Sequence, residues 1–370
     1  APPRAEHVVI APRNLIEAKI AEIWEQVLAI SSVGVNEDFF QIGGHSLIAV
    51  RMMAMIRNHF QKSLPLASLF QNPTIAGLAK ILAGTEEGKG SRILVEIQPH
   101  GAGTPFFCVH PVGGGVLCYA DLAHALGQNR PFYGLQSPPP GSVSEPLQSI
   151  EDMAALYIQE IRQVQPKGPY SLGGWSIGGL IALEMARQLA RDGESVRPLV
   201  LFDTHPPENR SFHDDGDSLP VLALFAADMS RLIGRDPGNL RERFLQLTPK
   251  EQESWILRTL KEEGILPQEG PEQELHTMLS VFARNNVAVE NYSLRQHPDR
   301  IVFFRATDSA APENLAEEWQ AATGAIIDLH LIPGDHYTML RKPHVSAIAE
   351  QMKRYFEEKD NTERALTMDA

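Results

Sequence analysis

The chain has 370 residues, of which 43% are hydrophobic and 21% are charged, as in ordinary globular domains. Its two cysteines, Cys108 and Cys118, are too few for a disulfide framework. No apolar run is long enough to cross a bilayer, and the first residues lack the basic and apolar segments of a signal peptide. These features predict a cytoplasmic protein of two domains, and we expect a monomer without metal ligands.

The net charge of -13 is unevenly distributed. Residues 1–82 contain seven Lys/Arg and six Asp/Glu, whereas residues 93–370 contain 24 and 38. Binding of nucleic acid is disfavoured, because neutralising phosphates requires clustered positive charge. Residues 83–92 between these parts contain three glycines, four charges and no large apolar residue, which predicts a flexible linker between two domains.

Residues 1–82 have the apolar spacing of helices. Asn14 is a candidate N-cap for a helix from Leu15 to about Ala29, and a second helix is expected from Ser46 to about Phe60. Thr74 is a candidate cap for a short helix over Ile75–Leu82. The pattern predicts a small all-α domain.

Beyond residue 92, short β-branched or aromatic runs alternate with amphipathic helices such as Ile150–Gln163 and Leu180–Arg191. The expected strands are Ile93–Ile97, Pro105–Val109, Phe132–Leu135, Tyr170–Leu172, Pro198–Phe202, Ile301–Phe304 and Asp328–Ile332. This alternation predicts an α/β domain with a mainly parallel sheet. From about Pro206 to Asp299 only helical stretches occur, which predicts a helical insertion acting as a lid.

One serine of interest lies in the segment Gly43-Gly44-His45-Ser46-Leu47. The glycines allow a tight bend, and Ser46 is expected at a helix N-terminus. A phosphodiester on its hydroxyl would there meet free N–H groups and the positive end of the helix dipole. The alternative is that Ser46 is only a helix cap.

The segment from Asp38 to Leu47 resembles the peptidyl carrier domains of nonribosomal peptide synthetases. The resemblance covers about residues 12–82, and it includes Phe39, Phe40 and the segment Leu69–Ile75. It implies a four-helix bundle with 4′-phosphopantetheine on Ser46. The implied partners are a phosphopantetheinyl transferase and upstream condensation and adenylation domains.

Acyl carriers of polyketide synthases more often have Asp where this chain has His45, so the peptidyl type is favoured. Leu47 and Val50 are candidates for contacts with partner enzymes, although burial in the core is an alternative for both.

A second serine lies in Gly174-Trp175-Ser176-Ile177-Gly178, which matches G-x-S-x-G between an expected strand and helix. This is the setting of a nucleophile elbow.

A serine hydroxyl needs a base, and His336, directly after the last expected strand, has the best context for that role. Either Asp203 or Asp308 could be the acid that orients the histidine, since both satisfy the chain order Ser, Asp, His. Asp335 is expected to shape the histidine loop.

An acyl-transfer site also needs two backbone donors for the oxyanion. One is expected from the N–H of Ile177. The other is expected from the glycine-rich loop His110–Gly115, which follows an early strand. Phosphate binding by this loop is less favoured, because it has neither G-x-G-x-x-G nor a P-loop Lys-Ser/Thr.

These segments resemble the type I thioesterase domains of nonribosomal peptide assembly lines. The match runs from about Ile93 to Phe356 and includes Pro131–Leu135 and Leu201-Phe202-Asp203. It implies an α/β-hydrolase fold with Asp203 as the acid, Asp308 as runner-up and Val112 as the second oxyanion donor. Residues 206–299 would be the lid.

Together the two resemblances predict a carrier–thioesterase didomain from the C-terminal end of a synthetase. A peptidyl or aminoacyl group would pass from Ser46 to Ser176 and be released by hydrolysis or macrocyclisation. The alternatives are the end of a mixed polyketide–peptide line and a non-catalytic carrier scaffold with a degenerate hydrolase fold. A stand-alone lipase or esterase would leave the carrier segment unexplained.

Overall fold

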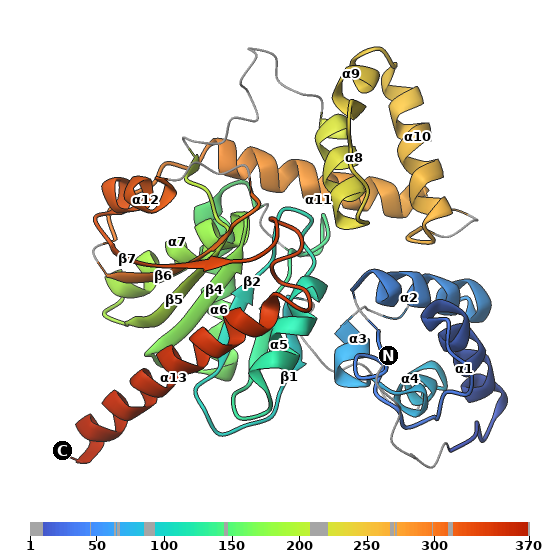
Figure 1. Ribbon diagram of the computed structural model, residues 1–370, viewed down its shortest axis with the longest axis horizontal. Coiled ribbons are helices and arrows are strands. Elements are labelled where there is room, and N and C mark those ends of the chain that lie inside the picture. Colours follow the sequence, from blue (N-terminus) through green and yellow to red (C-terminus); the bar gives the residue numbers. More distant parts are fainter. Residues whose placement is uncertain are drawn as a thin grey trace. The chain divides into compact units, whose positions relative to one another are not determined.

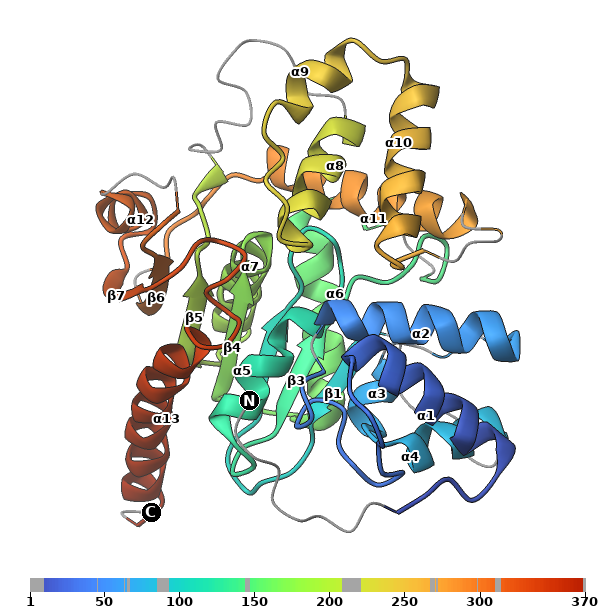
Figure 2. The same ribbon diagram turned by 45° about the vertical axis from the view of Figure 1, so that its right-hand side comes forward.

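The computed structural model describes most of the chain in two compact units (Figures 1 and 2). The first unit comprises residues 1–90 and 253–275, and the second comprises residues 91–252 and 276–370. The described residues are 10–44, 46–62, 64, 67–84, 93–143, 147–207, 221–266, 270, 272–297, 299–309 and 314–368. His45 and most of the expected linker 83–92 lie outside them. The expected domain boundaries stay a prediction, and residues 253–275, expected in the lid, group with the first unit.

The N-terminal part of the first unit is helical, as the residue pattern predicts. Its helices are α1 (Leu15–Leu28), α2 (Ser46–Phe60), α3 (Ala67–Gln71) and α4 (Ile75–Leu82). The side chain of Asn14 accepts a hydrogen bond from the N–H of Glu17 at 2.9 Å, and that of Thr74 accepts one from Gly77 at 3.0 Å. Both expected N-caps are confirmed, and each satisfies an N–H that has no partner within its helix.

The segment before α2 is shaped by Phe39, which is fully buried. Its ring packs edge-on against Trp24 with 5.0 Å between ring centroids. The N–H of Gly44 donates to the carbonyl of Phe39 at 2.8 Å, and a Cβ on Gly44 would lie 2.3 Å from the Phe39 ring. A side chain at residue 44 is therefore excluded by packing, two residues before α2 begins.

The second unit is built on a seven-stranded sheet with the order β1-β3-β2-β4-β5-β6-β7. The strands are β1 (Leu94–Gln98), β2 (Phe106–Val109), β3 (Phe132–Leu135), β4 (Tyr170–Trp175), β5 (Val196–Phe202), β6 (Arg300–Ala306) and β7 (Ile326–Ile332). Only the pairing of β1 with β3 is antiparallel in this sheet. The expected mainly parallel sheet is confirmed.

Helices cover both faces of the sheet (Figure 1). On one face lie α5 (Ala120–Leu126) and α13 (Val345–Met368), and on the other lie α6 (Ile150–Val164) and α7 (Ile177–Arg191). The short η1 (Leu117–Tyr119) precedes α5, and α12 (Leu315–Thr323) connects β6 to β7. Every residue of β2, β3 and β4 is buried, which is the expected consequence of covering a parallel sheet on both faces.

The insertion between β5 and β6 is helical, as expected. It contains α8 (Val221–Leu232), α9 (Leu240–Leu245), α10 (Pro249–Glu262) and α11 (Glu272–Glu290). Ala288 and Val289 of α11, and Tyr292 just beyond it, belong to the main hydrophobic core of the second unit. The C-terminal half of α11 is thus part of the core rather than a detached cover. Among the described residues, no helix is long and apolar enough to span a membrane.

A buried carboxylate ties α7 to the end of the insertion. Glu184 is fully buried and accepts hydrogen bonds from Arg187 at 2.6 and 2.7 Å, from Gln188 at 3.0 Å and from the Tyr292 hydroxyl at 3.1 Å. Burial opposes the charge of Glu184, but these donors outweigh it and hold the pKa of the carboxyl below its usual value.

We expect Glu184→Gln to destabilise the second unit at neutral pH by roughly 3 kcal/mol, because it leaves the Arg187 charge largely buried and unpaired. The folded-state pKa of Glu184 is lowered, so its contribution is present above the usual glutamate pKa and is lost as the pH falls through the folded value. The difference in urea unfolding free energy between wild type and variant should therefore shrink as the pH falls below the usual glutamate pKa and through the lower folded-state value. Glu317→Gln, at an exposed position of α12, is the matched control. A difference that does not change with pH would contradict the assignment.

Candidate active site

The register of the parallel strands brings four loops to one edge of the sheet. Val109 of β2 lies beside Gly174 of β4, Trp175 beside Phe202 of β5, and Phe202 beside Phe304 of β6. The segments that follow these strands therefore emerge together at their carboxyl ends, where α/β folds place their sites.

Ser176 lies between the last residue of β4 and the first of α7, in a backbone conformation with φ 57° and ψ -125°. L-residues rarely adopt this region, and the surrounding structure must hold it. The N–H of Ser176 donates to the carbonyl of Phe202 at 3.0 Å. A Cβ on Gly174 would lie 2.1 Å from the backbone of Gly178, and a Cβ on Gly178 would lie 2.2 Å from the carbonyl oxygen of Val109. Both glycines of the pentapeptide are therefore sterically required, as a nucleophile elbow demands.

Asp203 and His336 form a direct hydrogen bond, with 2.7 Å between Asp203 Oδ2 and His336 Nδ1. Asp203 is fully buried, and its Oδ1 accepts a further hydrogen bond from the N–H of Ala306 at 3.0 Å. Burial opposes ionisation of Asp203, but the hydrogen bond from His336 and the electrostatic attraction to its ring, together with the Ala306 N–H, hold the pKa of Asp203 below the usual value. An ionised acceptor places the ring proton on Nδ1, which leaves Nε2 of His336 free to act as a base.

Asp308, the other acid left open by the residue pattern, lies in an exposed position on the loop after β6. Its carboxylate accepts a hydrogen bond from the Thr307 hydroxyl at 3.0 Å, and its N–H donates to the carbonyl of Gly334. The structure brings Asp203, and not Asp308, into contact with His336. The geometry supports Asp203 as the acid, a role that stays a prediction.

The His336 ring lies beside the elbow. It packs against the Trp175 ring with 5.0 Å between ring centroids, and Trp175 directly precedes Ser176. Within the described part of the chain, no hydrogen bond joins the Ser176 hydroxyl to this ring. Such bonds are often long in the absence of substrate and close when substrate binds.

Hydrogen bonds of Asp335 and of Tyr337 hold the loop that contains His336. Asp335 Oδ1 accepts from the N–H groups of Tyr337 and Thr338 at 2.9 and 2.8 Å, which shapes the turn as expected. The Tyr337 hydroxyl donates to Asp228 Oδ1 of α8 at 2.8 Å. Burial raises the pKa of Asp228. Nothing in the residue pattern singles out Asp228, because its partner lies 109 residues away along the chain.

The two expected oxyanion donors come from different segments, the start of α7 and the loop after β2. Ile177 is the first residue of α7, so its N–H has no acceptor within the helix. Val112 lies in a turn closed by the hydrogen bond from the N–H of Gly114 to the carbonyl of Pro111 at 2.9 Å. A Cβ on Gly114, whose φ is 80°, would lie 2.6 Å from Val281.

The start of this turn is fixed by the buried side chain of His110. Its Nδ1 lies 2.8 Å from the carbonyl oxygen of Pro111, and its Nε2 lies 2.7 Å from the Tyr157 hydroxyl. Burial lowers the pKa of His110 to about 4, so the ring is neutral. One tautomer satisfies both contacts, with Nδ1–H donating to Pro111 and Nε2 accepting from Tyr157. His110 therefore acts as a fixed support of the loop.

Tyr119, another residue that no motif indicates, links β2 to β4. Its fully buried hydroxyl donates to the carbonyl of Val109 and accepts from the N–H of Trp175 at 2.9 Å. The ends of β2 and β4 are thus joined through one side chain.

In the first unit, Ser46 is the first residue of α2, as expected. The preceding Gly43 has φ 108°, and Gly44 lies tightly against Phe39. Ser46 therefore begins the 15-residue α2, where the first N–H groups have no partner within the helix, and two glycines lie two and three residues before it. This arrangement fits a serine that holds a phosphodiester.

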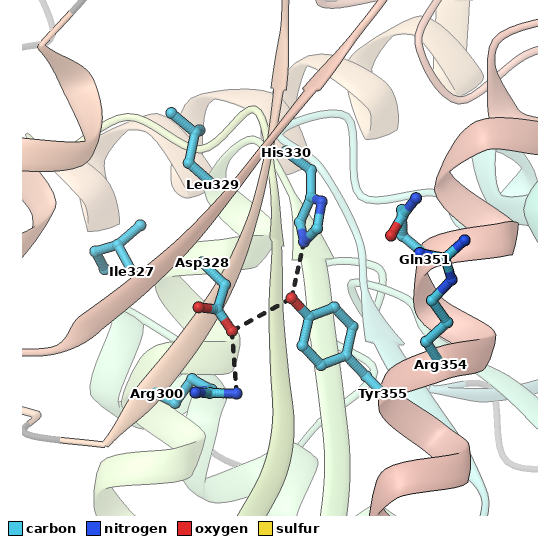
Figure 3. A pocket seen from close by; sticks show the side chains of 8 residues that line it. All are labelled: Arg300, Ile327, Asp328, Leu329, His330, Gln351, Arg354 and Tyr355. Carbon is cyan, nitrogen blue, oxygen red and sulfur yellow. Dashed lines mark hydrogen bonds and ion pairs between the residues drawn. The ribbon is translucent and has the colours of Figure 1, made fainter.

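A hollow of about 420 Å³ lies elsewhere, at the outer strand β7 (Figure 3). His330 Nε2 lies 2.8 Å from the Tyr355 hydroxyl, which donates to Asp328 at 3.3 Å, and Arg300 pairs with Asp328 at 3.4 Å. These polar groups satisfy one another between β6, β7 and α13. None of the candidate catalytic residues lines this hollow.

Two family models match the chain. The model described as "Thioesterase domain" matches residues 104–356, and the model described as "Phosphopantetheine attachment site" matches residues 18–82.

Curated relatives and solved structures agree with these models. The dimodular nonribosomal peptide synthase of Bacillus subtilis (strain 168) is 35% identical over 296 residues, which are 80% of this chain and 12% of that protein. Malpinin synthetase of Mortierella alpina is 43% identical over 195 residues, or 52% of this chain and 2% of that protein. A crystal structure of holo-AB3403, a four-domain nonribosomal peptide synthetase, is 30% identical with a TM-score of 0.66, covering 95% of this chain and 27% of that one. The chain thus spans only a small part of the length of these proteins.

We expect Asp203→Asn to lower kcat for a small soluble acyl thioester by roughly 10³- to 10⁴-fold, because an amide at this position favours the wrong histidine tautomer. Asp308→Asn is the matched control, since its side chain is exposed and bonded only locally. Steady-state kinetics on both variants give the comparison. A larger loss of kcat in Asp308→Asn would reverse the assignment.

Proposed function

The chain belongs to the thioesterase domain family, and we propose that it receives an acyl group on its own carrier unit and releases it as the final product of a nonribosomal peptide synthetase. The matches to both family models confirm the expected carrier–thioesterase arrangement, its α/β-hydrolase fold and its 4′-phosphopantetheine cofactor. The observation that carries the proposal is the hydrogen bond between buried Asp203 and His336 beside the strained Ser176 elbow.

Ser46 is the residue that would hold the cofactor. Its place as the first residue of α2, after two glycines, supports this assignment. When bound, 4′-phosphopantetheine supplies a thiol on a long arm, and this thiol holds the acyl group as a thioester.

In the first half of the reaction, Ser176 attacks the thioester carbonyl while Nε2 of His336 takes its hydroxyl proton. Ionised Asp203 stabilises the imidazolium that forms. The N–H groups of Ile177 and Val112 stabilise the oxyanion, at about 3 kcal/mol for each donor. The carbon–sulfur bond then breaks, His336 returns the proton to the departing thiol, and the acyl group stays on Ser176 as an ester.

In the second half, His336 removes a proton from water or from a nucleophile within the acyl chain. Attack on the ester passes through a second oxyanion at the same two donors, and His336 returns the proton to Ser176. Water yields a free acid, and an internal hydroxyl or amine yields a lactone or a lactam.

The proposed partners follow from this role: a phosphopantetheinyl transferase, upstream condensation and adenylation domains, and a peptidyl or aminoacyl substrate. Cys108 and Cys118 are free thiols whose pKa values are raised by burial, which agrees with the proposed cytoplasmic location. We propose a monomer as the working state.

The carrier role is tested by intact-mass analysis. Incubation with coenzyme A and a phosphopantetheinyl transferase should add one phosphopantetheine to the chain, and Ser46→Ala should abolish the addition. Ser31→Ala, at an exposed serine of the same unit, should be modified like wild type. Modification of Ser46→Ala to the wild-type extent would show that another residue holds the cofactor.

The nucleophile is tested on the loaded chain. An acyl group attached to the carrier should persist as a thioester in Ser176→Ala, because the attacking oxygen is absent, and should be discharged by wild type. Ser142→Ala, at an exposed serine of the second unit, is expected to discharge like wild type. Equal discharge rates for Ser176→Ala and wild type would remove Ser176 from the mechanism.

A further inference from the structure

The helical insertion reaches the turn that contains Val112. Asn285 of α11 is fully buried, and its Nδ2 donates to the carbonyl oxygen of Val112 at 2.8 Å. Asn285 shares a helix face with Phe282, Ala288 and Val289, which are all buried. A buried amide on an apolar helix face costs free energy unless it makes a hydrogen bond, and this bond crosses 173 residues of sequence.

The orientation of the Asn285 amide follows from the same contact. Its Oδ1 is buried and has no hydrogen-bond partner in the described part of the structure. Exchanging the two amide atoms would place Oδ1 against the Val112 carbonyl oxygen, with two acceptors facing each other. The hydrogen bond from Nδ2 to the Val112 carbonyl is therefore the one that fixes the orientation of the Asn285 amide.

The bond matters because it holds the glycine side of the turn, whereas His110 and the hydrogen bond from Gly114 to Pro111 hold its start. Val112 is followed by Gly113, Gly114 and Gly115, which have wide backbone freedom. The Val112 N–H belongs to the preceding peptide, whose Pro111 carbonyl is held by His110 and by the Gly114 N–H, so the bond from Asn285 fixes Val112 from its other side. Catalytic hydrogen-bond donors act only when they already point at the developing charge.

A second contact from α11 supports the far side of the turn. Arg284 Nη2 donates to Ser137 Oγ at 2.5 Å and to the Pro138 carbonyl at 2.9 Å. The N–H of Ser137 in turn donates to the carbonyl of Gly114 at 2.9 Å. Adjacent residues of one helix thus hold the turn at Val112 and at Gly114.

We propose that Asn285 is a positioning residue, which anchors Val112 through its carbonyl and thereby restrains the position of the Val112 N–H relative to the oxyanion. The inference rests on the proposed function, because it assumes that Val112 is an oxyanion donor. Since Asn285 lies in the insertion, it also makes α11 the element through which the insertion acts on the chemical step.

The test uses the 370-residue chain and a small soluble acyl thioester. Asn285→Asp preserves the shape of the side chain but places a carboxylate oxygen where the donor was, and Asn285→Leu removes the polar group. We expect kcat to fall by roughly 10- to 100-fold in both, less than the loss of a direct donor, with KM within about threefold of wild type. A peptide trifluoromethyl ketone, which forms an oxyanion on the serine, should lose affinity in the same proportion as kcat/KM.

The pH profile of Asn285→Asp separates positioning from general destabilisation. Burial raises the pKa of the introduced carboxyl, and once protonated its O–H can donate to Val112. The ratio of variant to wild-type kcat should therefore rise as the pH falls, whereas for Asn285→Leu the ratio should stay flat. If Asn285→Leu fails to fold, Asn285→Asp alone tests the inference: a ratio of variant to wild-type kcat that rises as the pH falls supports it, and a flat ratio contradicts it.

Asn286→Asp and Asn286→Leu are the matched controls. The Asn286 amide donates to Phe282 within its own helix at 2.9 Å, so kcat should stay within about twofold of wild type. Folded Asn285 variants with wild-type kcat, a loss confined to KM, or equal losses in the Asn286 variants would overturn the inference. If Ser176→Ala abolishes turnover while the Asn285 variants are normal, the inference fails and the proposed function stands. If the wild-type chain discharges no thioester, both the inference about Asn285 and the proposed function fail.

Discussion

The first turn of α7 lies against the end of β2, and there is no room for a side chain between them. A Cβ on Gly178 would lie 2.2 Å from the Val109 carbonyl oxygen, and one on Gly174 would overlap the backbone of Gly178. This close approach places Ser176 and Ile177 beside the loop that follows β2. It also forces Ser176 into a conformation that L-residues rarely adopt. The hydrogen bonds of Tyr119 to both strands hold the same junction from within the core. Ser176 and the loop that contains Val112 therefore have one common support.

The helical insertion has two different relations to the site. Through Asp228 it contacts Tyr337, the neighbour of His336, and through Asn285 it contacts Val112. Ala288 and Val289 of α11 belong to the core, so the bond of Asn285 to Val112 is made by a packed part of the insertion. By contrast, residues 253–275 group with the carrier unit. Most of the insertion thus belongs to the second unit, and a shorter stretch of it belongs to the first.

Much of the fold and part of the site could be predicted because they depend on local chemistry. Alternating strands and helices, the caps Asn14 and Thr74, and the glycines around Ser176 each have a local physical cause that the residues alone reveal. The choice between Asp203 and Asp308 was different, because both follow a strand and both lie between the serine and the histidine in the chain. Only the arrangement of β5 and β6 directs Asp203 toward His336 and leaves Asp308 exposed. Asn285 was not singled out by the residue pattern, because both its burial and its bond to Val112 depend on the packing of α11.

By itself, the sequence determined that there is a small near-neutral helical unit, a larger acidic α/β unit and a serine of interest in each. Periodicity, turn residues and net charge are properties of neighbouring residues, so they can be read without coordinates. The tertiary structure alone decided which groups meet: Asp203 with His336, Tyr119 with two strand ends, and Asn285 with Val112. These contacts join residues separated by 10 to 173 positions, and they form because parallel strands and packed helices bring distant backbone groups to one edge of the sheet.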